Sequence, residues 1–271
     1  MISISDKEFH QFSTYIKNHY GINLKEEKKI LLAGRLQNVL IQNGFQNFQD
    51  YYNYIQSDHT GERVTALINK ITTNHTFFMR EVNHFYYFRD VVLPQLENQV
   101  KEKDLRIWSA GCSSGQEPYT LAMMIDEYFE QDKILWDTKI LATDISHKVL
   151  EEAKSGVYSI EEIQDIPSQW KIKYFKNIHD KSYISDKLKN EIIYRKFNLM
   201  EKTFPFKKKF HVIFCRNVMI YFDTKTKQEL IQKFYDSMEY GGYLFIGHSE
   251  SLNREETKFK YVMPAVYRKE L

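Results

Sequence analysis

A short apolar run that ends in a glycine-bounded turn constrains this chain more than any other feature. Residues 105–115 read L-R-I-W-S-A-G-C-S-S-G, and Glu117 and Pro118 then open a helical pattern. A strand that leads through such a turn into a helix places backbone N–H groups and the positive end of the helix dipole beside a bound molecule. Gly111 and Gly115 allow a sharp turn and a close approach of the ligand, because they carry no Cβ atom. The pattern predicts a ligand site in an α/β sheet. The alternative is a tight strand-to-helix connection that binds no ligand.

A second apolar run, residues 138–144, ends on the carboxylate of Asp144, and a helical pattern follows it over 146–154. In doubly wound sheets, an acidic residue at the end of the second strand accepts hydrogen bonds from ribose hydroxyls. Asp is also a favoured residue at the N-cap of a helix. Asp144 is therefore a candidate ribose ligand, with helix capping as the alternative.

Composition and charge limit the classes of protein to which the chain can belong. Its 271 residues suggest about one to two domains, and 42% hydrophobic with 27% charged residues is ordinary for a globular protein. A net charge of +2 with one dense basic cluster, residues 207–209, gives little support for nucleic-acid binding. The N-terminus lacks a secretory signal, and no apolar stretch reaches the ~18 residues of a membrane span. We expect a cytoplasmic protein that binds no nucleic acid and does not insert into a membrane.

The chain has two cysteines, Cys112 and Cys215, which are too few for a disulfide framework or a Cys-rich zinc site. Both are expected to be free thiols at the ends of neighbouring strands. The nine histidines are scattered along the sequence, so we expect no metal.

The spacing of apolar residues divides the chain into a helical first part and an α/β second part. Helical spacing continues over residues 1–72, with helices expected at 6–18, 24–42, 48–57 and 62–72. From about residue 84, strand-like and helix-like runs alternate, which predicts a parallel sheet. The strands are expected at 105–110, 139–143, 211–215 and 243–247, with an antiparallel edge strand within 258–269.

Helices are expected between these strands at 119–129, 147–154 and 226–238. Residues 174–197 break the rhythm with strand-like runs at 183–184 and 192–194, which indicates a small inserted β-subdomain. We therefore expect a helical domain over 1–72, a linker over 73–83 and an α/β domain over 84–271.

Three basic residues, Lys25, Lys28 and Arg35, have the spacing of one face of the second expected helix. Such residues ordinarily keep a helix soluble. Alternatively, they form a surface that docks an acidic helical partner.

The carboxyl ends of parallel strands meet at one rim, where ligands bind in open α/β sheets. The expected strands end at Cys112, at Asp144, at Arg216 with Asn217, and at residues 248–250. Tyr221 lies one helical turn beyond Asn217, where it is either a core aromatic or a residue of the rim.

Six sequence blocks, in this order, resemble the CheR family of chemotaxis receptor methyltransferases. They are T-T-N-H-T-F-F-M-R-E (72–81), A-G-C-S-S-G-Q-E-P-Y-T-L-A-M (110–123), the strand ending at Asp144, F-N-L (197–199), F-C-R-N-V-M-I-Y-F-D (214–223) and G-H-S-E-S-L (247–252). The resemblance covers nearly the whole chain. It implies methyl transfer from S-adenosylmethionine to glutamate side chains on the cytoplasmic helices of chemoreceptors. It also implies a helical N-terminal domain and a Rossmann-like methyltransferase domain with a small inserted β-subdomain.

The resemblance also implies the residues of the site. Contacts with S-adenosylmethionine, or with its product S-adenosylhomocysteine, are implied at Asn74, Thr76, Arg80, Glu117, Asp144, Asn198, Leu199, Arg216 and Asn217. Catalytic roles are implied for Arg80 and Tyr221, with Tyr221 near the transferred methyl group. Arg80 could hold the methionyl carboxylate or the substrate glutamate, and a structural ion pair with Glu81 is the alternative.

One departure from the family concerns how the substrate is found. Members that tether to a C-terminal receptor peptide carry a glycine-rich loop in the β insertion, whereas residues 176–190 contain no glycine. We therefore expect direct recognition of the methylation helices, through Lys25, Lys28 and Arg35, without a peptide tether. Separately, we expect a monomer.

Three other functions share parts of the pattern. A nicotinamide-dependent dehydrogenase has the same fold, but its fingerprint needs a third glycine where this chain has Ser113 and Ser114. A nucleic-acid methyltransferase usually has a proline-rich turn at 217–220 and a more basic chain. A non-catalytic cofactor sensor could lack Arg80 and Tyr221, and both are present.

Overall fold

The computed structural model describes residues 2–72 and 75–270, which divide into two units. The first unit holds the N-terminal residues through His75, together with residues 198–200 and 221–227. The second unit holds the rest of the chain. None of the helices in the described part of the chain is long and apolar enough to cross a membrane.

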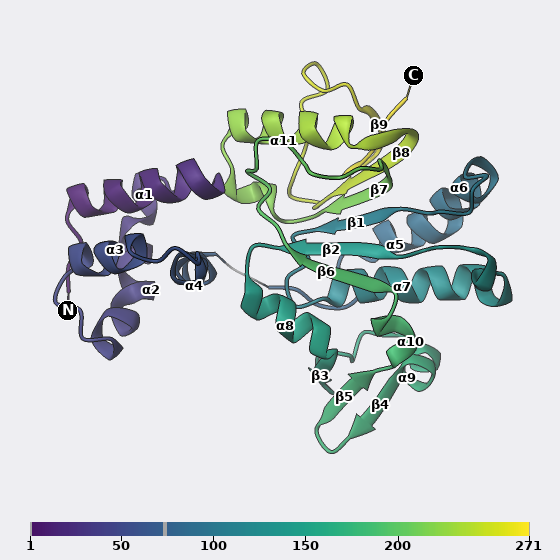
Figure 1. Cartoon of the computed structure of the whole chain (residues 1–271), viewed down its shortest axis with the longest axis horizontal. Coiled ribbons are helices and arrows are strands. Elements are labelled where there is room, and N and C mark those ends of the chain that lie inside the picture. Colours follow the sequence, from purple (N-terminus) through teal and green to yellow (C-terminus); the bar gives the residue numbers. More distant parts are fainter. Residues whose placement is uncertain (1, 73–74, 271) are drawn as a thin grey trace. The chain divides into compact units, whose positions relative to one another are not determined.

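Four α-helices form most of the first unit: α1 (Asp6–Tyr20), α2 (Lys29–Gln42), α3 (Phe48–Gln56) and α4 (Glu62–Ile71) (Figure 1). α1 begins with a capping box, in which the Ser5 hydroxyl and the Glu8 carboxylate each accept an N–H from the other residue. The four helices confirm the helical first part. The helix expected from residue 24 begins only at Lys29, because a 3-10 turn (Glu26–Lys28) precedes it.

A seven-stranded sheet forms the centre of the second unit, in the order β6-β2-β1-β7-β8-β10-β9. Its strands are β1 (Ile107–Ala110), β2 (Ile140–Asp144), β6 (Ile192–Lys196), β7 (Phe210–Cys215), β8 (Met238–Ile246), β9 (Lys260–Met263) and β10 (Val266–Arg268). The first five strands of the order are parallel to one another. β10 pairs with both β8 and β9 in antiparallel fashion. This confirms the parallel sheet. The expected edge strand is a hairpin of two strands. From β1, the chain adds β2 and β6 on one side of the sheet and then β7 and β8 on the other side. Ligands bind in such sheets at this topological switch point, between β1 and β7.

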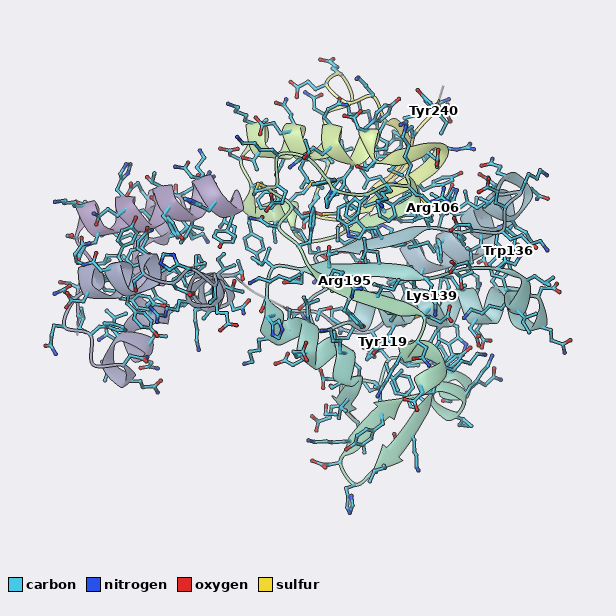
Figure 2. The ribbon with its side chains drawn as sticks, in the orientation of Figure 1. Arg106, Tyr119, Trp136, Lys139, Arg195 and Tyr240 are labelled. Carbon is cyan, nitrogen blue, oxygen red and sulfur yellow. The ribbon has the colours of Figure 1, made fainter. Side chains whose placement is uncertain are left out.

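Helices cover both faces of this sheet (Figure 1). They are α5 (Asn83–Tyr87), a π-helix (Phe88–Val92), α6 (Leu93–Gln99), α7 (Gln116–Phe129), a 3-10 segment (Glu130–Leu135), α8 (His147–Ser155) and α11 (Thr224–Asp236). Neighbouring residues of β1 point to opposite faces. The Trp108 ring lies 5.4 Å from that of Phe234 in α11, whereas the Ser109 hydroxyl donates to Glu117 in α7. The buried Tyr119 of α7 donates its hydroxyl to a carbonyl of α8 (Figure 2).

A second, antiparallel sheet has three strands in the order β3-β5-β4: β3 (Val157–Ser159), β4 (Phe175–Ile178) and β5 (Lys181–Ile184). Two short helices accompany it, α9 (Ser168–Tyr174) and α10 (Asp186–Lys189). The run expected at 183–184 belongs to this sheet, but the run at 192–194 is β6 of the main sheet. The β4–β5 hairpin turns with His179 at φ 56°, so the glycine-free sequence does form a tight turn.

Candidate active site

The turn after β1 has the backbone conformation that its glycines predict. Gly111 and Gly115 have φ values of 83° and 94°, in the left-handed region that favours glycine. The N–H groups of Gly111 and Cys112 both donate to the Thr143 carbonyl at the end of β2, at 2.8 and 2.9 Å. A Cβ atom on Gly111 would lie 2.5 Å from a methyl carbon of Val218. The sequence led us to expect a ligand in the space that a Cβ atom of Gly111 would fill. The structure places Val218 in that space instead.

Asp144 connects the end of β2 to the same turn. Its Oδ1 accepts the N–H of Ser146 (2.9 Å), and its Oδ2 accepts the N–H of Ser113 (3.0 Å). Ser146, whose hydroxyl accepts from Val149, is the N-cap of α8, so the alternative that Asp144 caps this helix is wrong. Burial raises the pKa of Asp144, and the donating N–H groups oppose this rise.

One guanidinium joins three segments of the rim. Arg216, at the end of β7, is buried, and its Nη1 donates to Oε2 of Glu117 (3.1 Å) while its Nη2 donates to Oε2 of Glu81 (3.0 Å). Nη2 also donates to the carbonyl of Arg80. Burial raises the pKa of Glu117, although Arg216 and the Ser109 hydroxyl counter the rise. Burial also opposes ionisation of Glu81, but Arg216, with hydrogen bonds from His248 and Asn217, outweighs this effect and the pKa of Glu81 is lowered.

The backbone around Arg80 is sharply bent. Met79 and Glu81 on either side have φ values of 62° and 57°, which are uncommon for residues with side chains. The guanidinium carbon of Arg80 lies 5.9 Å from the ring centroid of Phe77. Glu81 was the alternative ion-pair partner for Arg80, and its carboxylate is paired with Arg216.

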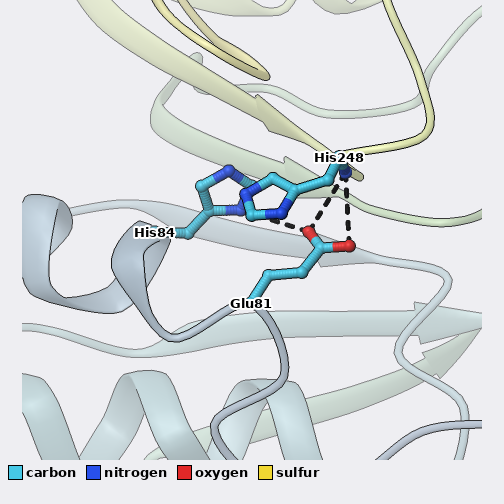
Figure 3. Close-up of side chains that lie close together, drawn as sticks. All are labelled: Glu81, His84 and His248. Atoms are coloured by element: carbon cyan, nitrogen blue, oxygen red, sulfur yellow. Dashed lines mark hydrogen bonds and ion pairs between the residues drawn. The ribbon is translucent and has the colours of Figure 1, made fainter.

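Glu81 also adjoins two histidines (Figure 3). Glu81, His84 and His248 each offer a ligand atom for a metal, and these atoms lie within 4.8 Å of one another. Burial lowers the pKa of His84 to about 4, and the charges of Arg216 and His248 add to the effect. Arg216 donates to the same Glu81 oxygen that faces His84, so a fixed positive charge already stands where a cation would bind. The charge of Arg216 therefore disfavours a metal ion at these three residues.

The other residues implied by the resemblance are distributed as follows. Thr76 is half-buried in the second unit, and Asn74 lies outside the described residues. Asn198, Leu199 and Tyr221 belong to the first unit, where Asn198 donates to the His19 carbonyl at 2.8 Å. Tyr221 ends a 3-10 helix (Met219–Tyr221), and its carbonyl accepts the N–H of Asn23 at 2.8 Å.

The three basic residues considered for docking differ in their surroundings. Lys25 and Lys28 are exposed and precede α2. Arg35 lies within α2, and its Nη1 donates to the Ile71 carbonyl at 2.5 Å. Arg35 therefore caps the C-terminus of α4, a structural contact that its spacing in the sequence does not reveal.

Comparisons with known proteins identify the family of the chain. Residues 7–72 match the family model described as "CheR methyltransferase, all-alpha domain", and residues 74–267 match "CheR methyltransferase, SAM binding domain". A "Chemotaxis protein methyltransferase" of Borreliella burgdorferi is 44% identical, with 99% of this chain and 96% of the relative covered. The protein of that description from Escherichia coli is 35% identical, with 98% and 92% covered. The chain therefore belongs to the CheR methyltransferase family.

Proposed function

We propose that this protein transfers a methyl group from S-adenosylmethionine to glutamate side chains of chemoreceptors, as a protein-glutamate O-methyltransferase. One observation carries the proposal: the Arg216 guanidinium joins Glu81 and Glu117. These three residues come from three of the sequence blocks that resemble the family, so segments distant in sequence meet at one rim. The names of the full-length relatives support the same activity.

The residues at this rim fit S-adenosylmethionine. An ionised carboxylate offers about four acceptor positions, and the backbone N–H groups of Ser113 and Ser146 occupy one on each oxygen of Asp144. Asp144 therefore keeps acceptor capacity for two ribose hydroxyls. The N-terminus of α7, with its positive dipole end, begins at the same turn.

The substrate chemistry needs no general base. A glutamate side chain has an ordinary pKa of about 4.3, so it is already an anionic nucleophile near neutral pH. S-adenosylmethionine would supply the methyl group from a cationic sulfonium, and the leaving group is the neutral thioether of S-adenosylhomocysteine. The task of the protein is to align the glutamate oxygen and to exclude water, and positioning of this kind can lower a barrier by up to ~7–11 kcal/mol.

We assign this positioning to Arg80 and Tyr221. The bent backbone at Met79 and Glu81 orients Arg80, whose guanidinium can hold a carboxylate of the cofactor or of the substrate. Tyr221 follows the turn after β7 and offers a hydroxyl and an aromatic face, and an aromatic face favours a cationic sulfonium. Arg80→Ala should abolish most methyl transfer with the fold intact. Arg89→Ala, a change at an exposed arginine paired with Asp90, is the matched control.

For substrate docking we propose direct recognition of the receptor's methylation helices by Lys25 and Lys28. Both are exposed, and their charge complements acidic helices. Arg35 is less suited to test this role, because reversing its charge would also remove the cap of α4. We also propose that no receptor-tail peptide tethers the protein. The lack of glycine in residues 176–190 no longer supports this proposal, since the β4–β5 hairpin turns without glycine. Deleting the receptor tail and, separately, changing Lys25 and Lys28 to Glu distinguishes the two modes.

The experiment that tests the function is a transfer assay. The protein is incubated with methyl-labelled S-adenosylmethionine and membranes that contain chemoreceptors. We expect label on the receptor that base releases as methanol, because methyl esters are base-labile. Label that resists base, or no label on the receptor, would refute the proposal.

A further inference from the structure

Glu250 lies beyond β8 in the segment G-H-S-E, only 7% exposed, yet no step of the proposed reaction uses its carboxylate. The groups that donate to it are backbone N–H groups. Oε2 accepts from Gly247 (2.6 Å) and Asn217 (3.0 Å), and Oε1 accepts from Ile220 (3.0 Å). A ring of backbone amides of this kind forms an anion-binding nest, here filled by a side chain of the protein itself.

The turn at 216–220 contains a left-handed residue and lies against the segment of Glu250. Asn217 has a φ of 59°, in the left-handed region that Asn adopts more readily than most residues with a side chain. The segment that carries Glu250 also packs directly against this turn. A Cβ atom on Gly247 would lie 2.5 Å from Nδ2 and 2.8 Å from the backbone nitrogen of Asn217.

The turn also carries groups of the rim. The Asn217 side chain donates to Oε1 of Glu81 (3.3 Å), and Arg216 holds Glu81 and Glu117. Tyr221 directly follows residue 220, the last residue of the turn. Thus Glu81 holds the side chains of the turn, whereas Glu250 holds its backbone.

We propose that Glu250 is a positioning residue for methyl transfer: its carboxylate fixes the backbone of residues 217–220 and thereby places Tyr221 for the reaction. This inference rests on the function proposed above. Glu81 still holds the side chain of Asn217, an implied cofactor contact, so the removal of Glu250 should slow the chemical step more than it weakens cofactor binding.

The test is Glu250→Gln, which keeps the shape of the side chain but replaces one acceptor oxygen with an NH2 group that faces N–H donors. The matched control is Glu255→Gln, at an exposed position five residues further on. A misplacement of about 1 Å can cost about 100-fold in rate, so we expect kcat per folded molecule to fall about 10- to 100-fold. The Kd for S-adenosylhomocysteine should change by less than about threefold.

Amide hydrogen exchange over 217–220 gives a readout that does not depend on activity. It should accelerate by at least about tenfold in Glu250→Gln and stay unchanged in Glu255→Gln. If the wild type transfers no methyl group, the proposed function fails, but the exchange data still test the anchor. Unchanged kcat per folded molecule, a parallel loss of affinity for S-adenosylhomocysteine, or unchanged exchange would overturn the inference.

If Glu250→Gln does not fold, Gly247→Ala provides the second test. The added methyl group pushes the same turn away from Glu250 without changing any charge. It should produce the same fall in kcat. A folded Gly247→Ala enzyme with normal kcat would contradict the proposed role.

Discussion

Replacing Arg216 by Met should destabilise the protein strongly, and the cost should depend on pH. The Arg216 side chain is 3% exposed, and its partners Glu81 and Glu117 are each 14% exposed. Removing one partner of a buried ion pair costs about 3–5 kcal/mol, because the remaining charge stays buried without compensation. Since water reaches both carboxylates in part, we expect about 3 kcal/mol near neutral pH, a large share of the ~5–15 kcal/mol typical of a folded domain.

The sign of the pH dependence follows from the two carboxyl groups. Burial already raises the pKa of Glu117, and the loss of Arg216 removes the main group that lowers the pKa of Glu81. A carboxyl group with a higher pKa in the folded than in the unfolded state binds a proton on folding, so its destabilising effect disappears as pH falls. The cost of Arg216→Met should therefore be larger near pH 8 than near pH 5.

Urea unfolding of the wild type and the variant, followed by tryptophan fluorescence at both pH values, measures this cost. Arg89→Met is the control, because Arg89 and Asp90 form an exposed pair that contributes only about 0–1 kcal/mol. A cost of Arg216→Met below about 1 kcal/mol, or the same cost at both pH values, would refute this reasoning.

Two further substitutions and one labelling experiment probe the turn and its surroundings. Asp144→Ala should weaken binding of S-adenosylhomocysteine by about 10- to 100-fold in calorimetry, since a charged hydrogen bond contributes about 1.5–3 kcal/mol; unchanged affinity would exclude a ribose contact. Cys112 and Cys215 are buried, and burial raises the pKa of both thiols. They should react with a thiol reagent only after unfolding, so rapid labelling of the native protein would contradict their burial. Gly111→Ala should cost about 1–3 kcal/mol in urea unfolding because of its left-handed φ and the contact with Val218; a neutral effect would show that the turn adapts.

Features encoded by neighbouring residues could be predicted from the sequence. The periodicity of Phe9, Phe12 and Ile16 predicts α1, and the apolar run before Gly111 predicts β1 and the turn that follows it. The position of Asp144 at the end of a strand was predicted for the same reason.

Features that depend on distant contacts could not be predicted in this way. Arg216 meets Glu81 and Glu117 across 135 and 99 residues, and the sequence placed Arg216 at the end of a strand without indicating that it pairs with either carboxylate. The placement of 192–196 as a strand beside β2 depends on pairing, which strand periodicity does not specify. His179 turns the β4–β5 hairpin in a conformation that sequence patterns associate with glycine.

The most direct test of the proposed function is to locate the transferred methyl groups on the receptor. A chemoreceptor is methylated by this protein with labelled S-adenosylmethionine, digested, and analysed by peptide mass spectrometry. We predict methyl esters on glutamate side chains of the cytoplasmic methylation helices, and their loss when those glutamates are changed to Ala. Methyl groups on lysine or cysteine, or esters confined to sites outside those helices, would contradict the account.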